Sequence, residues 1–300
     1  MTFFNVIQWK NLLMIVLVQA LIHYHLMFVF NLESNLSNFT FVLLTLASII
    51  IAAGGYIIND IQDLEADQIN KPDQVWIPKY ATLNTAKSLY YFVSFLGLLL
   101  GVYVAIAIQN YSSANWFMLP IILLYIYAKW AKKVLFLGNI LVAALIAFSL
   151  VLVVLFEGVR FEQINSVSIS FLETIIGLVN FAFLLNLIRE IIKDAQDETG
   201  DRVQGVDSIP IRFGKETTHI IIQIITGLLV GFLLFMTVRF YNTQPALVIY
   251  LVSAILVGLL LFLSQLNKVQ KTTDYAKLSS LLKLLMLAGL FSVFFIQHHV

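Results

Sequence analysis

Residues 39–67 read FTFVLLTLASIIIAAGGYIINDIQDLEAD, so a long apolar stretch runs directly into an acidic one. The apolar part, residues 39–58, carries no charge and is long enough to cross the roughly 30 Å hydrocarbon core of a bilayer as a helix. Asp60, Asp63 and Asp67 follow, and in a helix this spacing puts all three on one face. Like charges stacked in this way repel one another, so the pattern indicates a bound cation, most simply a divalent one.

Apolar stretches of this kind account for most of the chain. Hydrophobic residues make up 60% of the sequence and charged residues 12%, against about 25% charged residues in a soluble domain. We therefore predict an all-α, polytopic membrane protein with about nine transmembrane helices in a bundle, forming a single domain over residues 1–300. The expected spans lie at roughly 11–31, 38–58, 88–108, 113–131, 137–157, 167–188, 218–238, 244–265 and 278–297.

Several kinds of site are excluded by what the chain lacks. It has no cysteine, which excludes disulfides, thiolate metal sites and cysteine nucleophiles. It has no His-Glu-x-x-His motif, no phosphate-binding Gly-rich loop and no dinucleotide fingerprint. A formal net charge of +1 gives no reason to expect a nucleic-acid partner. We interpret His23 and His25, inside the first expected span, as helix-packing residues.

Basic residues are divided unevenly between the connections. Of the 18 Lys and Arg residues, only Arg160 and Arg239 fall in connections that follow odd-numbered spans. Cytoplasmic connections of membrane proteins are enriched in Lys and Arg. We therefore expect a multi-pass protein of the cell membrane with a cytoplasmic N-terminus and cytoplasmic even-numbered connections. The C-terminus, at His298 and His299, would lie on the opposite side.

A second acidic run repeats the spacing of the first. Residues 189–201 read REIIKDAQDETGD and follow the sixth expected span, so Asp194, Asp197 and Asp201 would form another carboxylate stripe. Both stripes are expected in cytoplasmic motif loops, near 59–87 and 189–217. Two stripes over one cavity suit Mg²⁺, whose oxygen ligands are often completed by substrate phosphates. A diphosphate held in this way becomes a good leaving group, because the metal neutralises the charge that develops on it.

These motifs resemble those of the UbiA superfamily of intramembrane prenyltransferases. Three elements carry the resemblance: an Asn-Asp-x-x-Asp-x-x-x-Asp signature with a basic-Pro pair, a Tyr-x-x-x-Lys element and a second Asp-x-x-Asp-x-x-x-Asp run, found here within residues 59–72, 125–129 and 194–201. The family usually has Arg at the position of Lys71, and Lys keeps the charge but loses the bidentate phosphate geometry. Residues 76–79, WIPK, also depart from the Arg-Pro-Ile-Pro-Ser-Gly that is more common there.

The resemblance implies a nine-helix bundle around a central cavity that opens sideways to lipid. It implies transfer of a prenyl group from a polyprenyl diphosphate to a lipophilic acceptor, in a cavity that shields an allylic cation from water. Mg²⁺ would be held by both signatures, at Asn59, Asp60, Asp63, Asp67, Asp194, Asp197 and Asp201. The second signature would also position or deprotonate the acceptor, so the expected catalytic residues are Asp194, Asp197, Asp201, Lys129 and Tyr125.

Polar residues near the signatures admit two interpretations each. We expect Lys129 to contact the diphosphate, with Tyr125 one turn earlier on the same helix face, and Lys132 to be a membrane-surface anchor. The basic residues before the second signature either contact phosphate or pair with neighbouring acids or lipid headgroups. Asn186 either joins two helices or contacts metal or acceptor. The expected substrate-binding set is Asn59, Lys71, Tyr125, Lys129, Asn186, Arg189 and Lys193.

The acceptor is suggested by two short stretches, 70–73 and 189–201. They are most similar to the family branch that prenylates the glycerol backbone of ether lipids, transferring geranylgeranyl to geranylgeranylglyceryl phosphate. The alternative is an aromatic acceptor of the 4-hydroxybenzoate, dihydroxynaphthoate, homogentisate, chlorophyllide or haem type, as in other branches. An alternative of another class, a cation-coupled transporter, should place acids in mid-span, where this sequence has few. The sequence makes no prediction of oligomeric state.

Overall fold

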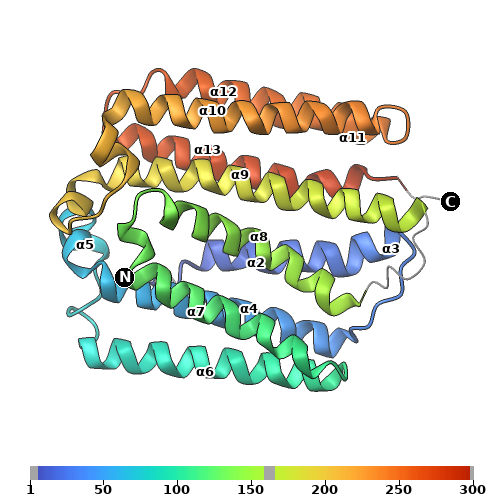
Figure 1. Cartoon of the computed structure of the whole chain (residues 1–300), viewed down its shortest axis with the longest axis horizontal. Coiled ribbons are helices and arrows are strands. Elements are labelled where there is room, and N and C mark those ends of the chain that lie inside the picture. The colour runs from blue at the N-terminus through green and yellow to red at the C-terminus, as the bar shows by residue number, and fades with distance from the viewer. Residues whose placement is uncertain (1–5, 159–165, 298–300) are drawn as a thin grey trace.

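The computed structural model describes residues 6–158 and 166–297. All regular structure within these ranges is helical, and Figure 1 shows the long helices side by side in one bundle. With η for short 3-10 or π-helical segments, the elements are α2 (Trp9–Ala20), η1 (Leu21–Leu26), α3 (Met27–Val29), α4 (Asn38–Gln62), α5 (Leu64–Asn70), η2 (Pro72–Gln74), α6 (Leu83–Ala107), η3 (Tyr111–Ala114), α7 (Asn115–Lys129), η4 (Ala131–Lys133), α8 (Leu137–Glu157), α9 (Ser166–Val203), α10 (Ile209–Phe240), α11 (Pro245–Tyr250), η5 (Leu251–Leu256), α12 (Val257–Leu266), α13 (Thr272–Phe291) and η6 (Ser292–Phe295).

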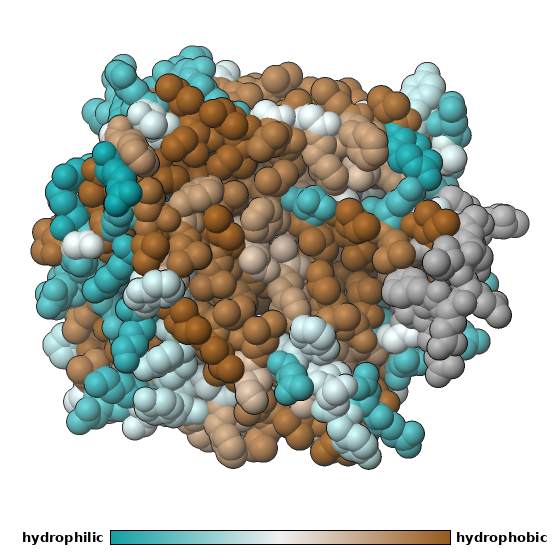
Figure 2. Space-filling model, viewed as in Figure 1, coloured by the Kyte–Doolittle hydropathy of each residue, from teal (hydrophilic) through white to brown (hydrophobic). Residues whose placement is uncertain are grey.

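The helix content confirms the predicted fold class. Over the described ranges, nine helices are long and apolar enough to cross a membrane. Figure 2 shows the surface that results, with a broad apolar belt between two polar ends. Large apolar side chains face outward along the belt, including Phe92 at 63% exposure, Ile249 at 68% and Val238 at 77%. Such a surface is stable only in contact with lipid, so the chain is a multi-pass membrane protein.

The predicted motif loops are largely wrong. The sixth span is predicted to end near residue 188, whereas α9 continues as a helix to Val203 and carries the whole second acidic run. The seventh is predicted to begin near residue 218, whereas α10 begins at Ile209 and bends at Gly214, where φ is 75°. Segment 59–87 likewise contains α5 and the start of α6. Hydropathy detects where a helix leaves the apolar layer, and a helix with polar partners continues past that point.

Close packing between helices depends on small residues. A side chain at Gly97 of α6 would meet the Ile51 side chain of α4 at 2.6 Å, and one at Gly101 would meet Phe117 of α7 at 2.3 Å. Glycine therefore lets α6 approach both neighbours, as small residues commonly do between membrane helices. The adjoining helix starts are capped in the ordinary way: the Ser37 hydroxyl accepts from the Thr40 N–H, and the Thr82 hydroxyl accepts from the Thr85 N–H.

One end of this bundle gathers the acidic motifs. The C-terminal ends of α4, α7 and α9 lie there together with α5, at the left of Figure 1. Asn70, the last residue of α5, makes two hydrogen bonds to α9. Its Nδ2 donates to the Asp197 carbonyl at 2.8 Å, and its Oδ1 accepts from the Gly200 N–H at 2.9 Å. The end of the first motif segment is thus fastened directly to the second.

Candidate active site

The first acidic motif lies on two helices. α4 ends at Gln62, and Asp63 leaves the helical conformation with φ −91° and ψ 7° before α5 begins at Leu64. The single helical stripe expected from the spacing is therefore interrupted at its middle carboxylate. All three Asp side chains of the motif nevertheless line the same cavity, because the Asp67 N–H still donates to the Asp63 carbonyl and the turn is tight.

The second acidic motif lies on the unbroken helix α9. Asp194, Asp197 and Asp201 occupy consecutive turns of one face and line the same cavity as the first motif. The convergence of two runs that are far apart in the sequence thus follows from the fold. The predicted stripe geometry holds for this motif.

The shared cavity has a volume of about 310 Å³. Its charged lining comprises seven carboxylates and four basic groups, namely Asp60, Asp63, Asp67, Glu190, Asp194, Asp197, Asp201, Lys71, Lys132, Arg189 and Lys193. Carboxylates therefore outnumber bases, and the excess lies in the Asp motifs. A cavity with this excess attracts cations.

Two lysines neutralise part of that charge. Lys71 Nζ lies 2.7 Å from Asp197 Oδ2, and Lys132 forms a short ion pair with Asp63. Burial by itself would lower the pKa of each ammonium, but the neighbouring carboxylates outweigh burial and hold the pKa of Lys71 and Lys132 above the ordinary range. Both lysines are therefore cationic, and Lys71 joins the end of α5 to α9.

Burial and repulsion by like charge act together on the carboxyl group of Asp67, the last residue of the first motif. Desolvation, followed by repulsion from Asp63, raises the pKa of the Asp67 carboxyl, while Lys71 partly opposes the rise. This carboxyl is more easily protonated than a solvated one until a cation offsets the repulsion. That behaviour is what the repulsion argument from the sequence anticipates.

Neutral donors also bond to three carboxylates of the motifs, one of which is the Asp63 carboxylate already paired with Lys132. Trp76 Nε1 donates to Asp60 at 2.8 Å, Asn139 Nδ2 donates to Asp194 at 2.7 Å, and Asn59 Nδ2 donates to Asp63 at 2.6 Å. Trp76 and Asn139 were not predicted as site residues. The available signal for Asn139 was a lone amide at the start of the apolar fifth span, and for Trp76 the departure from the family pattern at residues 76–79.

The lysine beside the acidic motifs differs from the expected one. Lys132, interpreted from sequence as a surface anchor, is 19% exposed in its side chain and lies inside the cavity. Lys129 and Tyr125 are not among the cavity-lining residues. Lys129 Nζ instead donates to the Tyr125 hydroxyl at 3.3 Å on an exposed part of α7. α7 ends at Lys129 and Lys132 belongs to the separate segment η4, so the two lysines do not continue one helix face.

Of the polar residues next to the second motif, three line the cavity and one does not. Glu190 accepts from Arg189 Nη1 at 2.9 Å and from Lys193 Nζ at 2.8 Å, and all three line the cavity. Arg189 and Lys193 therefore pair with a neighbouring acid, which is one of the two interpretations given above, and both still line the cavity. Asn186 Nδ2 donates to the Ala182 carbonyl of its own helix at 2.8 Å, and Asn186 is buried away from the cavity lining.

The donor set fits a hard divalent cation. Asn59 Oδ1 is buried and, among the described residues, accepts no hydrogen bond, although its amide nitrogen is bonded to Asp63. An unpartnered amide oxygen beside several carboxylates is a typical Mg²⁺ or Ca²⁺ ligand. Within the described part of the chain, no three acidic or His side chains are already gathered around one point. Four of the carboxylates are instead bonded individually to lysine, tryptophan or asparagine partners.

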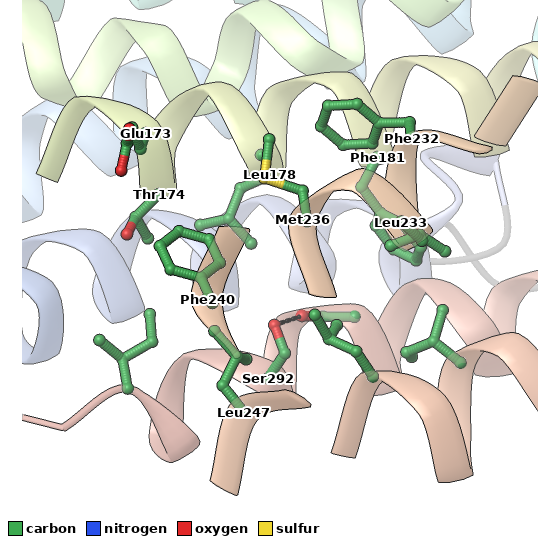
Figure 3. A pocket seen from close by; sticks show the side chains of 15 residues that line it. Glu173, Thr174, Leu178, Phe181, Phe232, Leu233, Met236, Phe240, Leu247 and Ser292 are labelled. Atoms are coloured by element: carbon green, nitrogen blue, oxygen red, sulfur yellow. Dashed lines mark hydrogen bonds between the residues drawn. The ribbon is translucent and has the colours of Figure 1, made fainter. Parts of the chain in front are cut away.

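A second cavity lies on another face of α9. It has a volume of about 60 Å³ and is lined mainly by apolar side chains of α9, α10 and α11, such as Phe181, Met236 and Leu247 in Figure 3. Its main charged feature is Glu173, which accepts from Arg239 at 2.9 Å. By helical spacing, Phe181 and Asp197 point to nearly opposite sides of α9. Among the described residues, no base lines this cavity to receive a phosphate, so the larger cavity is the candidate active site.

Comparisons with known proteins agree with this geometry. The model of the UbiA prenyltransferase family matches residues 16–290. A digeranylgeranylglyceryl phosphate synthase of Sulfolobus acidocaldarius is 32% identical over 60% of this chain and 60% of that protein. One from Methanococcus vannielii is 32% identical over 67% of this chain and 68% of that protein. The chain thus aligns with about 60% of the length of the first curated relatives it matches.

Solved structures share the fold. A digeranylgeranylglyceryl phosphate synthase superposes with a TM-score of 0.64 at 22% identity, covering 97% of this chain and 95% of that one. A UbiA homologue from Archaeoglobus fulgidus, bound to DMAPP and Mg²⁺, superposes with a TM-score of 0.61 at 15% identity, covering 98% and 99%. The family match spans nearly every helix described above. The chain therefore belongs to the UbiA prenyltransferase family.

Proposed function

We propose that the protein transfers a prenyl group from a polyprenyl diphosphate to a lipophilic acceptor in an Mg²⁺-dependent reaction that releases diphosphate. One observation carries the proposal: two Asp motifs from distant parts of the chain converge on one cavity that also contains Lys71 and Lys132. The carboxylates suit the metal, and the lysines suit the diphosphate oxygens. Family membership supports the same reaction.

The cation would be held by the two motifs together. The residues that we assign to it are Asn59, Asp60, Asp63, Asp67, Asp194, Asp197 and Asp201. When bound, Mg²⁺ supplies Lewis-acid neutralisation of the departing diphosphate. Asn139 and Trp76 fix the orientation of their Asp partners, which keeps the oxygen donors turned toward the cavity.

Prenyl transfer then requires one bond to break and one to form. The carbon–oxygen bond at C1 of the prenyl group breaks, and its electron pair leaves with the diphosphate, next to Lys71 and Lys132. The acceptor oxygen bonds to C1 and loses its proton, which we assign to a carboxylate of the second motif, because α9 holds those groups rigidly. Burial of the cavity among helices limits access of water to the allylic centre.

The acceptor that we favour is a prenylglyceryl phosphate, as in ether-lipid synthesis. The support is the set of relatives described as digeranylgeranylglyceryl phosphate synthases, which share 27–35% identity with this chain over about 60% of its length in the first five matches. A basic side of the cavity, with Arg189 and Lys193, also favours an anionic acceptor over a neutral one.

For the membrane topology, we propose that the N-terminus and both Asp motifs face the cytoplasm. The distribution of Lys and Arg supports this orientation, since only Arg160 and Arg239 of the 18 fall in connections that follow odd-numbered spans. An odd number of spans would put the C-terminus on the opposite side. His298 and His299, which mark it in the sequence, lie outside the described residues. We treat the whole chain, 1–300, as one catalytic domain.

The test uses purified full-length protein with labelled geranylgeranyl diphosphate and a panel of acceptors. We expect prenyl transfer to geranylgeranylglyceryl phosphate with stoichiometric diphosphate release, no transfer to 4-hydroxybenzoate or dihydroxynaphthoate, and background rates after chelation of divalent metal. Re-addition of Mg²⁺ should restore the rate. Transfer that persists without divalent metal would overturn the metal-dependent mechanism, and transfer to an aromatic acid alone would overturn the assigned acceptor.

A further inference from the structure

The second cavity, which the proposed reaction does not use, lies between membrane-spanning helices and is partly open. Figure 3 shows its lining, with Glu173 and Thr174 at one end and Phe181 and Phe232 at the other. Its volume of about 60 Å³ exceeds the space that one water molecule needs and is well below that of cavities that hold a benzene ring. The cavity therefore suits part of a narrow hydrocarbon chain rather than a ring.

The polar and apolar ends of this cavity lie at different depths in the bundle. Glu173 lies near the start of α9, and its partner Arg239 lies one residue before the end of α10. Phe181 lies eight residues further along α9, about 12 Å deeper at 1.5 Å per residue. A ligand that fills the cavity must therefore direct an apolar part inward and keep a polar part near the helix ends, as a membrane lipid does.

The polar end presents an unused hydrogen-bond acceptor. Arg239 donates to Glu173 through Nε at 3.0 Å and through Nη2 at 2.9 Å, and both bonds end on Oε1. A guanidinium that pairs with a carboxylate more often engages both of its oxygens. Here Oε2 is buried and accepts no hydrogen bond from the described residues. Because a buried acceptor without a partner is unfavourable, this oxygen is suited to a donor that the protein does not supply.

The charges at the polar end decide which head group fits. Glu173 and Arg239 form an ion pair, so their charges largely cancel. An added phosphate would be repelled by Glu173, and an added ammonium by Arg239. A hydroxyl carries no net charge and donates the hydrogen bond that Oε2 lacks. The site therefore favours a lipid with a hydroxyl head over one with a charged head.

The open space lies on one side of the cavity only. A side chain at Gly289 of α13 would meet the Phe181 ring at 2.0 Å, so the lining is tightly packed there. A side chain at Gly177 of α9, which also lines the cavity, would meet nothing within 4 Å. Leu251 and Ile255 of the lining belong to the π-helical segment η5, and π-helical turns are rare and occur often at functional sites. The space beside Gly177 is thus a local feature of an otherwise packed region.

We propose that the second cavity binds a hydroxyl-bearing membrane lipid, with a hydrocarbon chain beside Gly177 and Phe181 and the hydroxyl donating to Glu173 Oε2. Such a lipid would fill the apolar gap between α9, α10 and α13 and satisfy the buried oxygen. The site is distinct from the active site, because Phe181 and Asp197 point to nearly opposite sides of α9. The proposal does not depend on prenyl transfer.

The experiment uses the full chain in nanodiscs of phosphatidylcholine, a lipid without a free hydroxyl. A long-chain alcohol with a photoactivatable diazirine in its chain is added, and its adducts are located by peptide mass spectrometry. Unlabelled hexadecanol competes with it, and hexadecyl methyl ether provides the same chain without an O–H donor. We expect adducts concentrated in segments 174–181 and 232–240, with the alcohol competing about tenfold better than the ether, as for one hydrogen bond to a charged acceptor.

Two variants test the chain and head contacts separately. Gly177→Leu should reduce these adducts to the level found elsewhere on the apolar belt, because its side chain would occupy the open space. Gly227→Leu is the matched control on α10, since its added carbon also meets nothing within 4 Å and Gly227 does not line the cavity. Glu173→Gln should abolish the preference for the alcohol, because its amide oxygen keeps the bonds from Arg239 and its NH₂ replaces the acceptor Oε2.

Several results would overturn the inference. One is an even spread of adducts over the apolar belt, and another is equal competition by alcohol and ether in the wild type, which would mean that water satisfies Oε2. Both measurements use the wild-type protein, so they decide the matter even where a variant fails to fold. Unchanged labelling of Gly177→Leu, or an alcohol preference that persists in Glu173→Gln, would contradict it equally. None of these results bears on the proposed prenyl transfer.

Discussion

The two Asp motifs have the same spacing and different structures. The first is divided by Asp63 between α4 and the short α5, whereas the second lies within α9, which runs unbroken over 38 residues. The second motif is therefore fixed relative to the bundle. The first depends on the angle between two helices and on the hydrogen bonds of Asn70 to α9. Identical spacing in sequence thus produces two different structures on the two sides of one cavity. The second motif lies in a single rigid helix, and the first spans the junction between α4 and α5.

The largest effect is expected when either Asp motif loses one of its assigned metal ligands. Asp63→Ala and Asp194→Ala should each reduce diphosphate release by about 10²–10³-fold, since a charge-stabilising group in a desolvated site typically contributes that much. Both variants should insert and fold. Asp73→Ala, an exposed carboxylate just after the first motif, is the control and should retain nearly full activity. Wild-type activity in either Asp63→Ala or Asp194→Ala would refute the metal-site assignment.

A second effect distinguishes Lys132 from Lys129, the two lysines considered as partners of the first motif and the diphosphate. Lys132→Ala should lower kcat/KM by about 10²-fold, because it removes a partly buried cation from Asp63 and from the diphosphate. Lys129→Ala, three residues earlier, should lower it by less than about threefold, since its partner is the exposed Tyr125 hydroxyl. The measurement is steady-state kinetics with varied prenyl diphosphate. The reverse order of effects would restore the assignment made from the Tyr-x-x-x-Lys spacing.

The smallest effect tests the contact between α5 and α9 at Gly200. A side chain at Gly200 would meet the Ala66 carbonyl at 2.6 Å and Asn70 Nδ2 at 2.5 Å, so Gly200→Ala should displace α5 from α9. We expect kcat/KM to fall about tenfold, a cost of about 1–3 kcal/mol for overpacking, with faster proteolysis near residues 64–82. Gly177→Ala is the matched control on the same helix, because its added carbon meets nothing within 4 Å. Equal behaviour of the two variants would show that the contact is not needed.

Much of the architecture was predictable because membrane insertion constrains sequence strongly. Hydropathy located nine spans, and matching Asp spacings indicated a shared cation site. The end of α9 was not predictable, because hydropathy reports the edge of the apolar layer and Val203 lies beyond it. Lys132 and Asn139 were missed for another reason. Their partners, Asp63 and Asp194, are 69 and 55 residues away in sequence, and only the packed bundle brings them together.

The ion pairs of Lys71 and Lys132 have a consequence for the order in which ligands enter. A divalent ion that arrives alone and takes Asp197 or Asp63 as a ligand must displace an ammonium, which then lies partly buried without a counter-charge. An ion that arrives with a diphosphate brings the anion that the displaced lysine needs. The two ion pairs therefore favour binding of the metal together with the prenyl donor, so that the lysines link the binding of one ligand to the binding of the other.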